Sequence, residues 1–231
     1  MVEKIHNGPW PAKMPLGEKL QALGISQEDF NFYSELFIQN RQRYMTKKDD
    51  EDWLVTKSKT GKFIKLHDHV VAYHLLGKYW LAVLAPEVPL HLCIDIDASH
   101  SLPSIYRIVR DWVPHPIVFQ SSDSKGLHVY AFRNFDFPIR ANKLIRITST
   151  ELKIRGVKTA PGICEVFPAP NKFLRLPLGK GSCLLDPNTL TPMDLSLRES
   201  IEFIKENLRR HSFEELFRGL YRKIGRPNVK F

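Results

Sequence analysis

Two carboxylates, Asp95 and Asp97, alternate with isoleucines in the segment Cys93-Ile94-Asp95-Ile96-Asp97. Residues two apart in a β-strand share a face, so the acids point one way and the isoleucines the other. Neighbouring carboxylates repel each other unless a proton or a cation offsets their charge. A hard divalent cation such as Mg²⁺ or Mn²⁺ is the usual partner of clustered carboxylate oxygens. The pattern predicts a metal site, or else one acid that caps the next helix and one that faces solvent.

A second segment combines small residues with two potential phosphate contacts. Residues 121–132 read Ser-Ser-Asp-Ser-Lys-Gly-Leu-His-Val-Tyr-Ala-Phe. Small residues let backbone N–H groups approach a phosphate, and Lys125 and His128 add donors and charge. Taken alone, the segment fits a hairpin turn with a core-facing histidine better than it fits a binding site.

A third segment places an acid and a base in consecutive apolar runs. Glu165 lies in Cys-Glu-Val-Phe-Pro at 164–168, and Arg175 lies in Phe-Leu-Arg-Leu-Pro-Leu-Gly at 173–179. A glutamate in a buried strand is costly unless it is paired or binds a metal ion. A salt bridge to Arg175 is the structural interpretation, and a metal ligand is the functional one.

In this order the three segments resemble the motifs of the archaeo-eukaryotic primase superfamily. Those motifs are hydrophobic-Asp-hydrophobic-Asp, a small-residue turn that ends in His, and a hydrophobic-acid pair. The resemblance covers about residues 30 to 185, and its third segment is most similar to primase-polymerases of mobile-element, conflict-system and CRISPR-associated loci. One position departs from the family pattern, because Gly126 stands where Ser usually precedes His128 by two residues.

The resemblance implies a template-directed nucleotidyltransferase, a DNA primase-polymerase that makes or extends primers from nucleoside triphosphates on single-stranded DNA. It also implies two divalent cations, Mg²⁺ or Mn²⁺, held by acids from neighbouring strands. The implied catalytic residues and metal ligands are Asp95, Asp97 and Glu165. The implied nucleotide-binding residues are Ser124, Lys125, Gly126, His128 and Arg175.

Two other functions fit parts of the sequence. A metal-dependent nuclease could combine Asp95 or Asp97 with Glu151 and Lys153, although both of the latter fall in a helical pattern where a surface position explains them. A non-catalytic RRM-like nucleic-acid-binding protein would use the sheet with structural acids. The aromatic Lys/Arg-Gly-Phe signature of RRMs is absent, which counts against that second alternative.

Composition agrees with a globular protein that has a polyanionic partner. The chain has 231 residues, a net charge of +9, 43% apolar residues and 26% charged residues, which suits a folded nucleic-acid-binding protein. Its cysteines are Cys93, Cys164 and Cys183, and their wide separation argues against a zinc site or a disulfide framework. The longest apolar run, residues 79–85, is too short to span a bilayer. We therefore expect a cytoplasmic protein without a membrane partner.

Apolar periodicity and turn residues predict an α+β fold. The expected strands are 53–56, 62–65, 79–84, 90–95, 116–120, 127–132 and 164–167, and the expected helices begin near 27, 68, 104, 138, 195 and 212. The strand-helix-strand-strand-helix-strand order around the acids predicts an RRM-like sheet. The resemblance implies that this catalytic sheet packs against a smaller N-terminal α/β half. We expect a core at 1–186, divided at about residue 85, and a basic helical tail at 187–231 that either contacts nucleic acid or caps the core.

Overall fold

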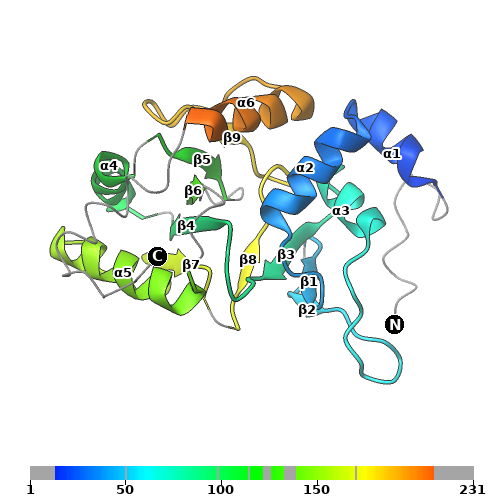
Figure 1. Ribbon diagram of the computed structural model, residues 1–231, viewed down its shortest axis with the longest axis horizontal. Helices are drawn as coiled ribbons and strands as arrows, with labels where there is room; N and C mark the ends of the chain where they lie inside the picture. The colour runs from blue at the N-terminus through cyan, green and yellow to red at the C-terminus, as the bar shows by residue number, and fades with distance from the viewer. Residues whose placement is uncertain are drawn as a thin grey trace, which may run out of the picture.

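The computed structural model describes residues 14–49, 51–97, 99–113, 115–121, 126–132, 139–169 and 171–210, with side chains as far as residue 208. Two antiparallel sheets with helices around them confirm the α+β class (Figure 1). The helices are α1 (Leu16–Leu23), α2 (Gln27–Phe37), α3 (Asp68–Leu75), α4 (Leu102–Trp112), α5 (Ala141–Ile154) and α6 (Leu197–Arg210). The strands are β1 (Tyr44–Lys47), β2 (Leu54–Val55), β3 (Trp80–Leu84), β4 (His91–Ile96), β5 (Ile117–Gln120), β6 (Leu127–Phe132), β7 (Cys164–Phe167), β8 (Phe173–Arg175) and β9 (Leu184–Leu185). Within the described residues, no helix is both long and apolar enough to cross a membrane.

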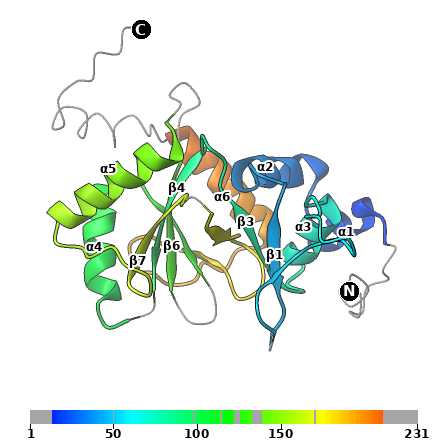
Figure 2. The same cartoon turned by 90° about the horizontal axis from the view of Figure 1, so that it is seen from below.

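The larger sheet has the predicted RRM-like topology. Its strand order is β7-β4-β6-β5-β9, and the chain runs β4-α4-β5-β6-α5-β7 through its first four strands. Helices α4 and α5 lie together on one side of this sheet (Figure 2). Val109 of α4 and Leu152 of α5 share a buried cluster with Ile94 and Val129, which face them from β4 and β6. The apolar alternation of β4 therefore buries its isoleucines under helices and turns Asp95 to the opposite side.

The smaller sheet has the order β2-β1-β3-β8 and belongs mostly to the N-terminal half. Strand β8, however, follows β7 in the chain and pairs with β3, with Arg175 opposite Ala82. The chain thus passes from the larger sheet to the smaller one between Phe167 and Phe173. The strand expected at 62–65 is wrong, because only an isolated bridge between Lys57 and Phe63 forms there. The segment Lys-Phe-Ile-Lys at 62–65 is too short and has too few apolar residues to hold a further strand.

A shared core joins the two sheets. Phe37 of α2 packs its ring edge-on against Tyr130 at 5.4 Å and against Phe119 at 6.1 Å between ring centroids. Ile201 and Ile204 of α6 belong to the same cluster, and both are 0% exposed. Aromatic burial of this size dominates core energetics, so the sheets and α6 stabilise one another. The helix at 197–210 is therefore part of the packed fold as well as the start of the predicted basic tail.

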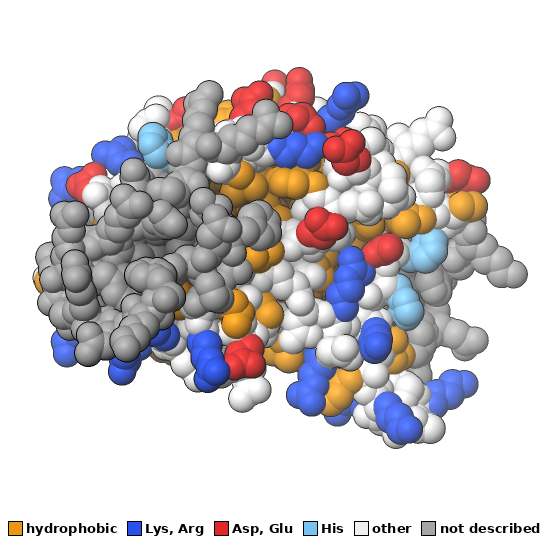
Figure 3. Space-filling view, in the orientation of Figure 1, with side chains coloured by type: hydrophobic (Ala, Val, Ile, Leu, Met, Phe, Trp, Pro, Cys, Tyr) orange, Lys and Arg blue, Asp and Glu red, His pale blue; other side chains and the backbone are white. Residues whose placement is uncertain are grey.

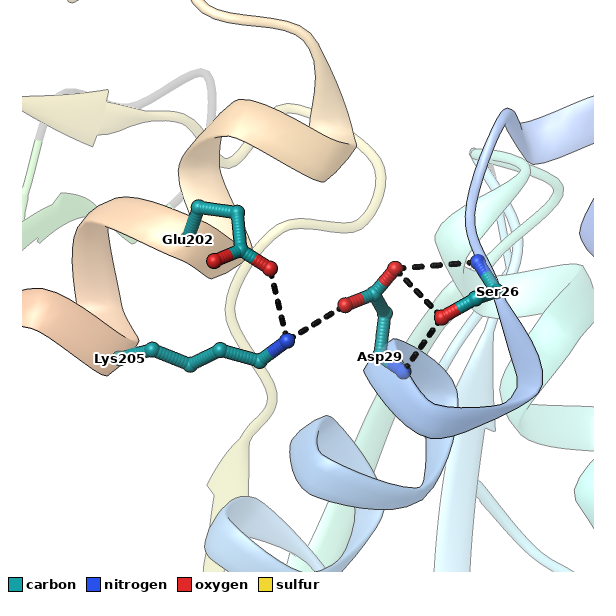
Figure 4. Close-up of polar contacts among 4 residues, drawn as sticks. All are labelled: Ser26, Asp29, Glu202 and Lys205. Carbon is teal, nitrogen blue, oxygen red and sulfur yellow. Dashed lines mark hydrogen bonds and ion pairs between the residues drawn. The ribbon is translucent and has the colours of Figure 1, made fainter.

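Helix α2 begins with a capping box that is also tied to α6 (Figure 4). The Ser26 hydroxyl and backbone N–H donate to Asp29 Oδ2 at 2.7 and 3.0 Å, and the Asp29 N–H donates to Ser26 Oγ at 3.0 Å. Lys205 of α6 donates to Asp29 Oδ1 at 2.6 Å and to Glu202 at 2.7 Å. Burial would raise the pKa of Asp29, but hydrogen bonds from Lys205 and Ser26 outweigh it and lower the pKa to about 2.

Asp29 should make the protein acid-sensitive below pH 4. Lowering the pKa from 3.8 to about 2 corresponds to roughly 2 kcal/mol of folding stability. Because the folded-state pKa is the lower one, this contribution is complete above the ordinary pKa and disappears as pH falls towards 2. We expect the stability difference between wild type and Asp29→Asn in urea unfolding to shrink by that amount between pH 6 and pH 2. A difference that stays constant with pH would contradict this role.

Candidate active site

The predicted acids of β4 and β7 lie side by side on the sheet. Asp95 pairs in register with Glu165 of β7 on one side and with His128 of β6 on the other. Directly opposed residues point to the same face, so these three side chains lie side by side on one face of the sheet. Asp97 follows Asp95 by two residues, and its N–H donates to the Ile163 carbonyl at 3.1 Å, which continues the pairing towards β7. We call Asp95, Asp97 and Glu165 the acid row.

The acid row continues an otherwise apolar face. Cys93, two residues before Asp95, pairs with Tyr130 and Phe167 on the two neighbouring strands, and all three belong to the core shared by the two sheets. Two positions further, Asp95 and Glu165 replace these apolar side chains and are 21% and 22% exposed. The carboxylates therefore stand where the shared core ends and solvent begins, on the side of the sheet away from α4 and α5.

His128 is both a core histidine and a neighbour of the acids. Its side chain is 2% exposed, and its Nε2 lies 3.5 Å from Asp95 Oδ1. The ring also packs edge-on against Tyr130, with 6.2 Å between ring centroids. The two interpretations of this residue, structural and functional, are thus compatible.

Two basic residues that follow β7 in the chain, Lys172 and Arg175, interact with the acid row. Arg175 donates from Nη1 to the Ser121 carbonyl at 3.1 Å, which connects β8 to the end of β5. Lys172 forms an ion pair with Glu165. The sequence had singled out Arg175 but not Lys172, because an ion pair between residues 165 and 172 depends on the turn that follows β7.

Burial and neighbouring charges shift the pKa values of Asp95 and Asp97 in opposite directions. Burial would raise the pKa of Asp95, but the charge and hydrogen bond of His128 and the charge of Arg175 lower it overall. For Asp97, burial and repulsion from Asp95 and Glu165 raise the pKa, and the same two bases only partly offset this. Asp95 is therefore the stabilised anion of the row, and Asp97 carries most of the repulsion.

Amide substitutions should therefore change stability with opposite signs. Asp95→Asn should lower the free energy of unfolding at pH 7 by about 1–3 kcal/mol, since it removes the carboxylate that faces His128 and attracts the Arg175 guanidinium. Asp97→Asn should raise it by up to about 1 kcal/mol, because it removes a repelled charge. The contribution of Asp95 is lost as pH falls below its ordinary pKa, whereas the cost of Asp97 builds up as pH rises from its ordinary pKa to its raised pKa. Urea unfolding without metal measures both effects, and changes of equal sign would be the contradicting result.

The oxygen chemistry of the acid row fits a hard divalent cation. As they stand, no three His, Cys, Asp or Glu side chains among the described residues gather closely enough to hold a metal ion. Asp95 faces His128 and Glu165 is paired with Lys172, so a cation would have to replace these partners. The metal-ligand assignment and the choice of Mg²⁺ or Mn²⁺ stay predictions.

The remaining predicted residues divide into three groups. Ser124 and Lys125 lie outside the described residues, so their triphosphate contacts stay predictions. The Gly126 carbonyl accepts a hydrogen bond from the Ser121 N–H at 2.7 Å, which closes the chain between β5 and β6 beside His128. Glu151 and Lys153 belong to α5, which covers the sheet face opposite the acids, and Glu151 pairs instead with Arg155 at 3.6 Å. The structure does not bring the nuclease set together.

Basic and aromatic side chains cover the face of the smaller sheet that carries Arg175. The Arg175 guanidinium lies 6.0 Å from the Trp53 ring, and Lys180 and Lys47 lie 5.1 and 5.9 Å from Trp80. Register supports a common face, because Lys47 pairs with Trp80 and Arg175 pairs with Ala82, two residues along β3. Beyond them, Arg43 and Lys57 lie over Phe63 at 4.1 and 5.3 Å. We call these eight residues the basic–aromatic face: Arg43, Lys47, Trp53, Lys57, Phe63, Trp80, Arg175 and Lys180.

In the space-filling view, Lys and Arg side chains gather beside apolar ones over β1, β2 and the loop after β2 (Figure 3). Sequence patterns alone missed this face, since its members come from four separate segments. Arg175 is the link between the two features, because it lies over Trp53 and also contributes its charge to the acids.

Comparisons with known proteins give a likeness to solved structures and no match in sequence. Neither the protein-family models nor the curated proteins match this sequence. Among solved structures, the polymerase domain from Mycobacterium tuberculosis ligase D in complex with DNA is similar, with a TM-score of 0.45 and 17% sequence identity. The match covers 84% of this chain and 93% of that chain. At this level of similarity, a functional assignment depends on the residues of the site.

Proposed function

We propose that the protein is a template-directed nucleotidyltransferase, a DNA primase-polymerase that makes or extends primers from nucleoside triphosphates with Mg²⁺ or Mn²⁺. The observation that carries the proposal is that Asp95 lies in register between Glu165 and His128 on one face of the sheet. Three carboxylates on one face, with basic groups on either side, suit a reaction that needs cations and a polyphosphate in the same place.

The acid row would hold the cations through Asp95, Asp97 and Glu165. Two bound divalent cations would supply an activated 3′-oxygen and would stabilise the pyrophosphate that leaves. Asp95 is suited to ligation because its lowered pKa keeps it ionised at neutral pH. Asp97 would gain most from a cation, because burial and repulsion from Asp95 and Glu165 raise its pKa and a positive charge relieves that repulsion.

The bases around the row would bind and orient the triphosphate. His128 is held by burial and by Asp95, so its ring has one defined position. Arg175 brings a permanent charge from the smaller sheet and is itself fixed by the Ser121 carbonyl. A guanidinium in a fixed position is well suited to phosphate oxygens, because its N–H groups match their geometry. Ser124, Lys125 and Gly126 would add contacts from the turn before β6.

The basic–aromatic face would bind the single-stranded template. Single-stranded nucleic acid is bound by aromatic rings that stack on bases and by cations that follow the backbone. Trp53, Trp80 and Phe63 each lie beside at least one Lys or Arg. Because Arg175 belongs to this face and also contributes charge to the acids, a strand on the face would lead to the reacting groups.

Trp53 should contribute to template affinity through its ring. Stacking on an aromatic side chain is worth about 1–3 kcal/mol per base, so Trp53→Ala should weaken binding of single-stranded DNA roughly 5- to 150-fold. Trp53→Phe should keep most of the affinity. Leu54→Ala is the matched control, because Leu54 is the next residue and 57% exposed. Fluorescence anisotropy with a labelled oligonucleotide measures the affinities. Equal affinities of Trp53→Ala and Leu54→Ala would remove Trp53 from the interface.

A primer-extension assay separates the proposed function from its alternatives. The protein is incubated with a labelled primer–template, nucleoside triphosphates and Mn²⁺, and the products are resolved by length. Longer products support the nucleotidyltransferase, and shorter ones indicate a nuclease. An unchanged primer that is nevertheless bound by the protein indicates a nucleic-acid-binding module. A second reaction without a primer tests whether chains are started de novo.

A further inference from the structure

Lys172 holds a positive charge beside Glu165, one of the three carboxylates of the acid row. It lies between β7 and β8, and its N–H donates to the Ala169 carbonyl at 3.1 Å, which brings the chain back towards β7. From this turn its ammonium forms an ion pair with Glu165 Oε1. The lysine is 49% exposed and the glutamate 22% exposed. Lys172 can therefore leave Glu165 for solvent at little cost, whereas Glu165 is fixed in the sheet.

The ion pair occupies the outer end of the acid row. His128 faces Asp95 from the β6 side, and Lys172 neutralises Glu165 from the edge of the sheet at β7. Arg175 adds a further positive charge that acts on both Asp95 and Asp97. Three carboxylates thus face two permanent cations and one histidine. The repulsion that clustered acids would otherwise suffer is reduced without any bound ion.

We propose that Lys172 is an internal counter-cation that a divalent cation must displace from Glu165, so that Lys172 sets the metal affinity of the nucleotide-free protein. The inference rests on the proposed function, because it takes the acid row as the metal site. An ammonium and a divalent cation cannot both contact the same carboxylate oxygen, so each weakens binding of the other. Arg175 cannot be displaced in the same way, since the Ser121 carbonyl anchors it.

Binding of Mn²⁺ alone tests this competition. The free Mn²⁺ signal in electron paramagnetic resonance is titrated with wild type, Lys172→Met and Lys153→Met, without nucleotide. Lys153 is the matched control, because it is exposed on α5 at the other face of the sheet and its loss changes the net charge equally. A partly exposed ion pair should give about two- to five-fold tighter Mn²⁺ binding in Lys172→Met. Lys153→Met should change affinity less than two-fold, and Lys172→Arg should stay near wild type.

A double-mutant cycle with Glu165→Gln identifies the partner. If Lys172 acts through Glu165, Lys172→Met should no longer tighten Mn²⁺ binding in the Glu165→Gln background. The inference is overturned if Lys172→Met binds Mn²⁺ no tighter than wild type, if Lys153→Met matches it, if the gain persists without Glu165, or if no variant binds Mn²⁺. Primer extension by wild type is measured separately. If wild type extends primers but Lys172→Met does not tighten Mn²⁺ binding, the inference fails and the proposed function stands. If Lys172→Met tightens Mn²⁺ binding but wild type does not extend primers, the metal site stands and the proposed reaction fails.

Discussion

Replacing Asp95 by Asn should lower the rate of nucleotide incorporation by on the order of 10³-fold. Asp95 is the central residue of its row, in register with both Glu165 and His128. Its loss would remove a cation ligand and the acceptor that faces the His128 ring. Single-turnover extension of a labelled primer, with enzyme in excess and Mn²⁺ present, measures the chemical step without interference from product release.

A matched acid shows whether the loss is specific. Asp111 is 64% exposed on α4, on the sheet face that is opposite the acids, so Asp111→Asn should extend the primer at the wild-type rate. The stability change expected for Asp95→Asn is checked by urea unfolding under the same buffer conditions, and assays are run where each variant is fully folded. Extension by folded Asp95→Asn at the wild-type rate would exclude Asp95 from catalysis.

The part of the site that the sequence could predict depends on local periodicity. Asp95 and Asp97 share a face because they are two residues apart in a strand, and His128 and Glu165 lie in similarly short apolar strands. The order of elements around them predicts the RRM-like sheet, and that topology brings the three strands together. Register then follows from the pattern of buried residues, because a slip by one residue would bury the acids under α4 and α5.

The part that could not be predicted depends on contacts between distant segments. Strand β8 leaves the larger sheet and pairs with β3, and this crossover places Arg175 near Trp53 and leaves Lys172 beside Glu165. No short-range pattern specifies which sheet a three-residue strand joins. The strands β1 and β9 and the helix α1 were missed for a related reason, because each is short and gains its stability from tertiary packing.

Helix α6 shows how charge can conceal a core element. Its sequence, Leu-Arg-Glu-Ser-Ile-Glu-Phe-Ile-Lys-Glu-Asn-Leu-Arg-Arg, is rich in charged residues and was predicted as the start of a basic tail. Ile201 and Ile204 are three residues apart, so they share one face of the helix. That face is buried against the core shared by the two sheets. The exposed face carries most of the charge, and the composition of the segment therefore describes its surface rather than its role in packing.

Ile201→Ala and Ile204→Ala should each lower the free energy of unfolding by about 2–5 kcal/mol. Both side chains are 0% exposed in the shared core, and truncation to Ala leaves a cavity that the surrounding residues fill only partly. Glu206→Ala, on the exposed side of the same helix, should change stability by less than about 0.5 kcal/mol. Urea unfolding followed by circular dichroism measures the three variants under one set of conditions. An isoleucine variant as stable as wild type would show that α6 only covers the core and does not help to form it.

The packing of α6 also determines what a chain that ends at Asp186 would lose. Such a chain lacks Ile201, Ile204 and the Lys205 ion pair with Asp29, so it should lose folding as well as the basic residues of the tail. A fall in template affinity would then report on unfolding rather than on contact with the strand. Charge substitutions on the exposed side of α6, such as Arg198→Gln, separate the two effects. If α6 contacts the template, they should reduce the salt dependence of DNA affinity while the unfolding midpoint stays unchanged.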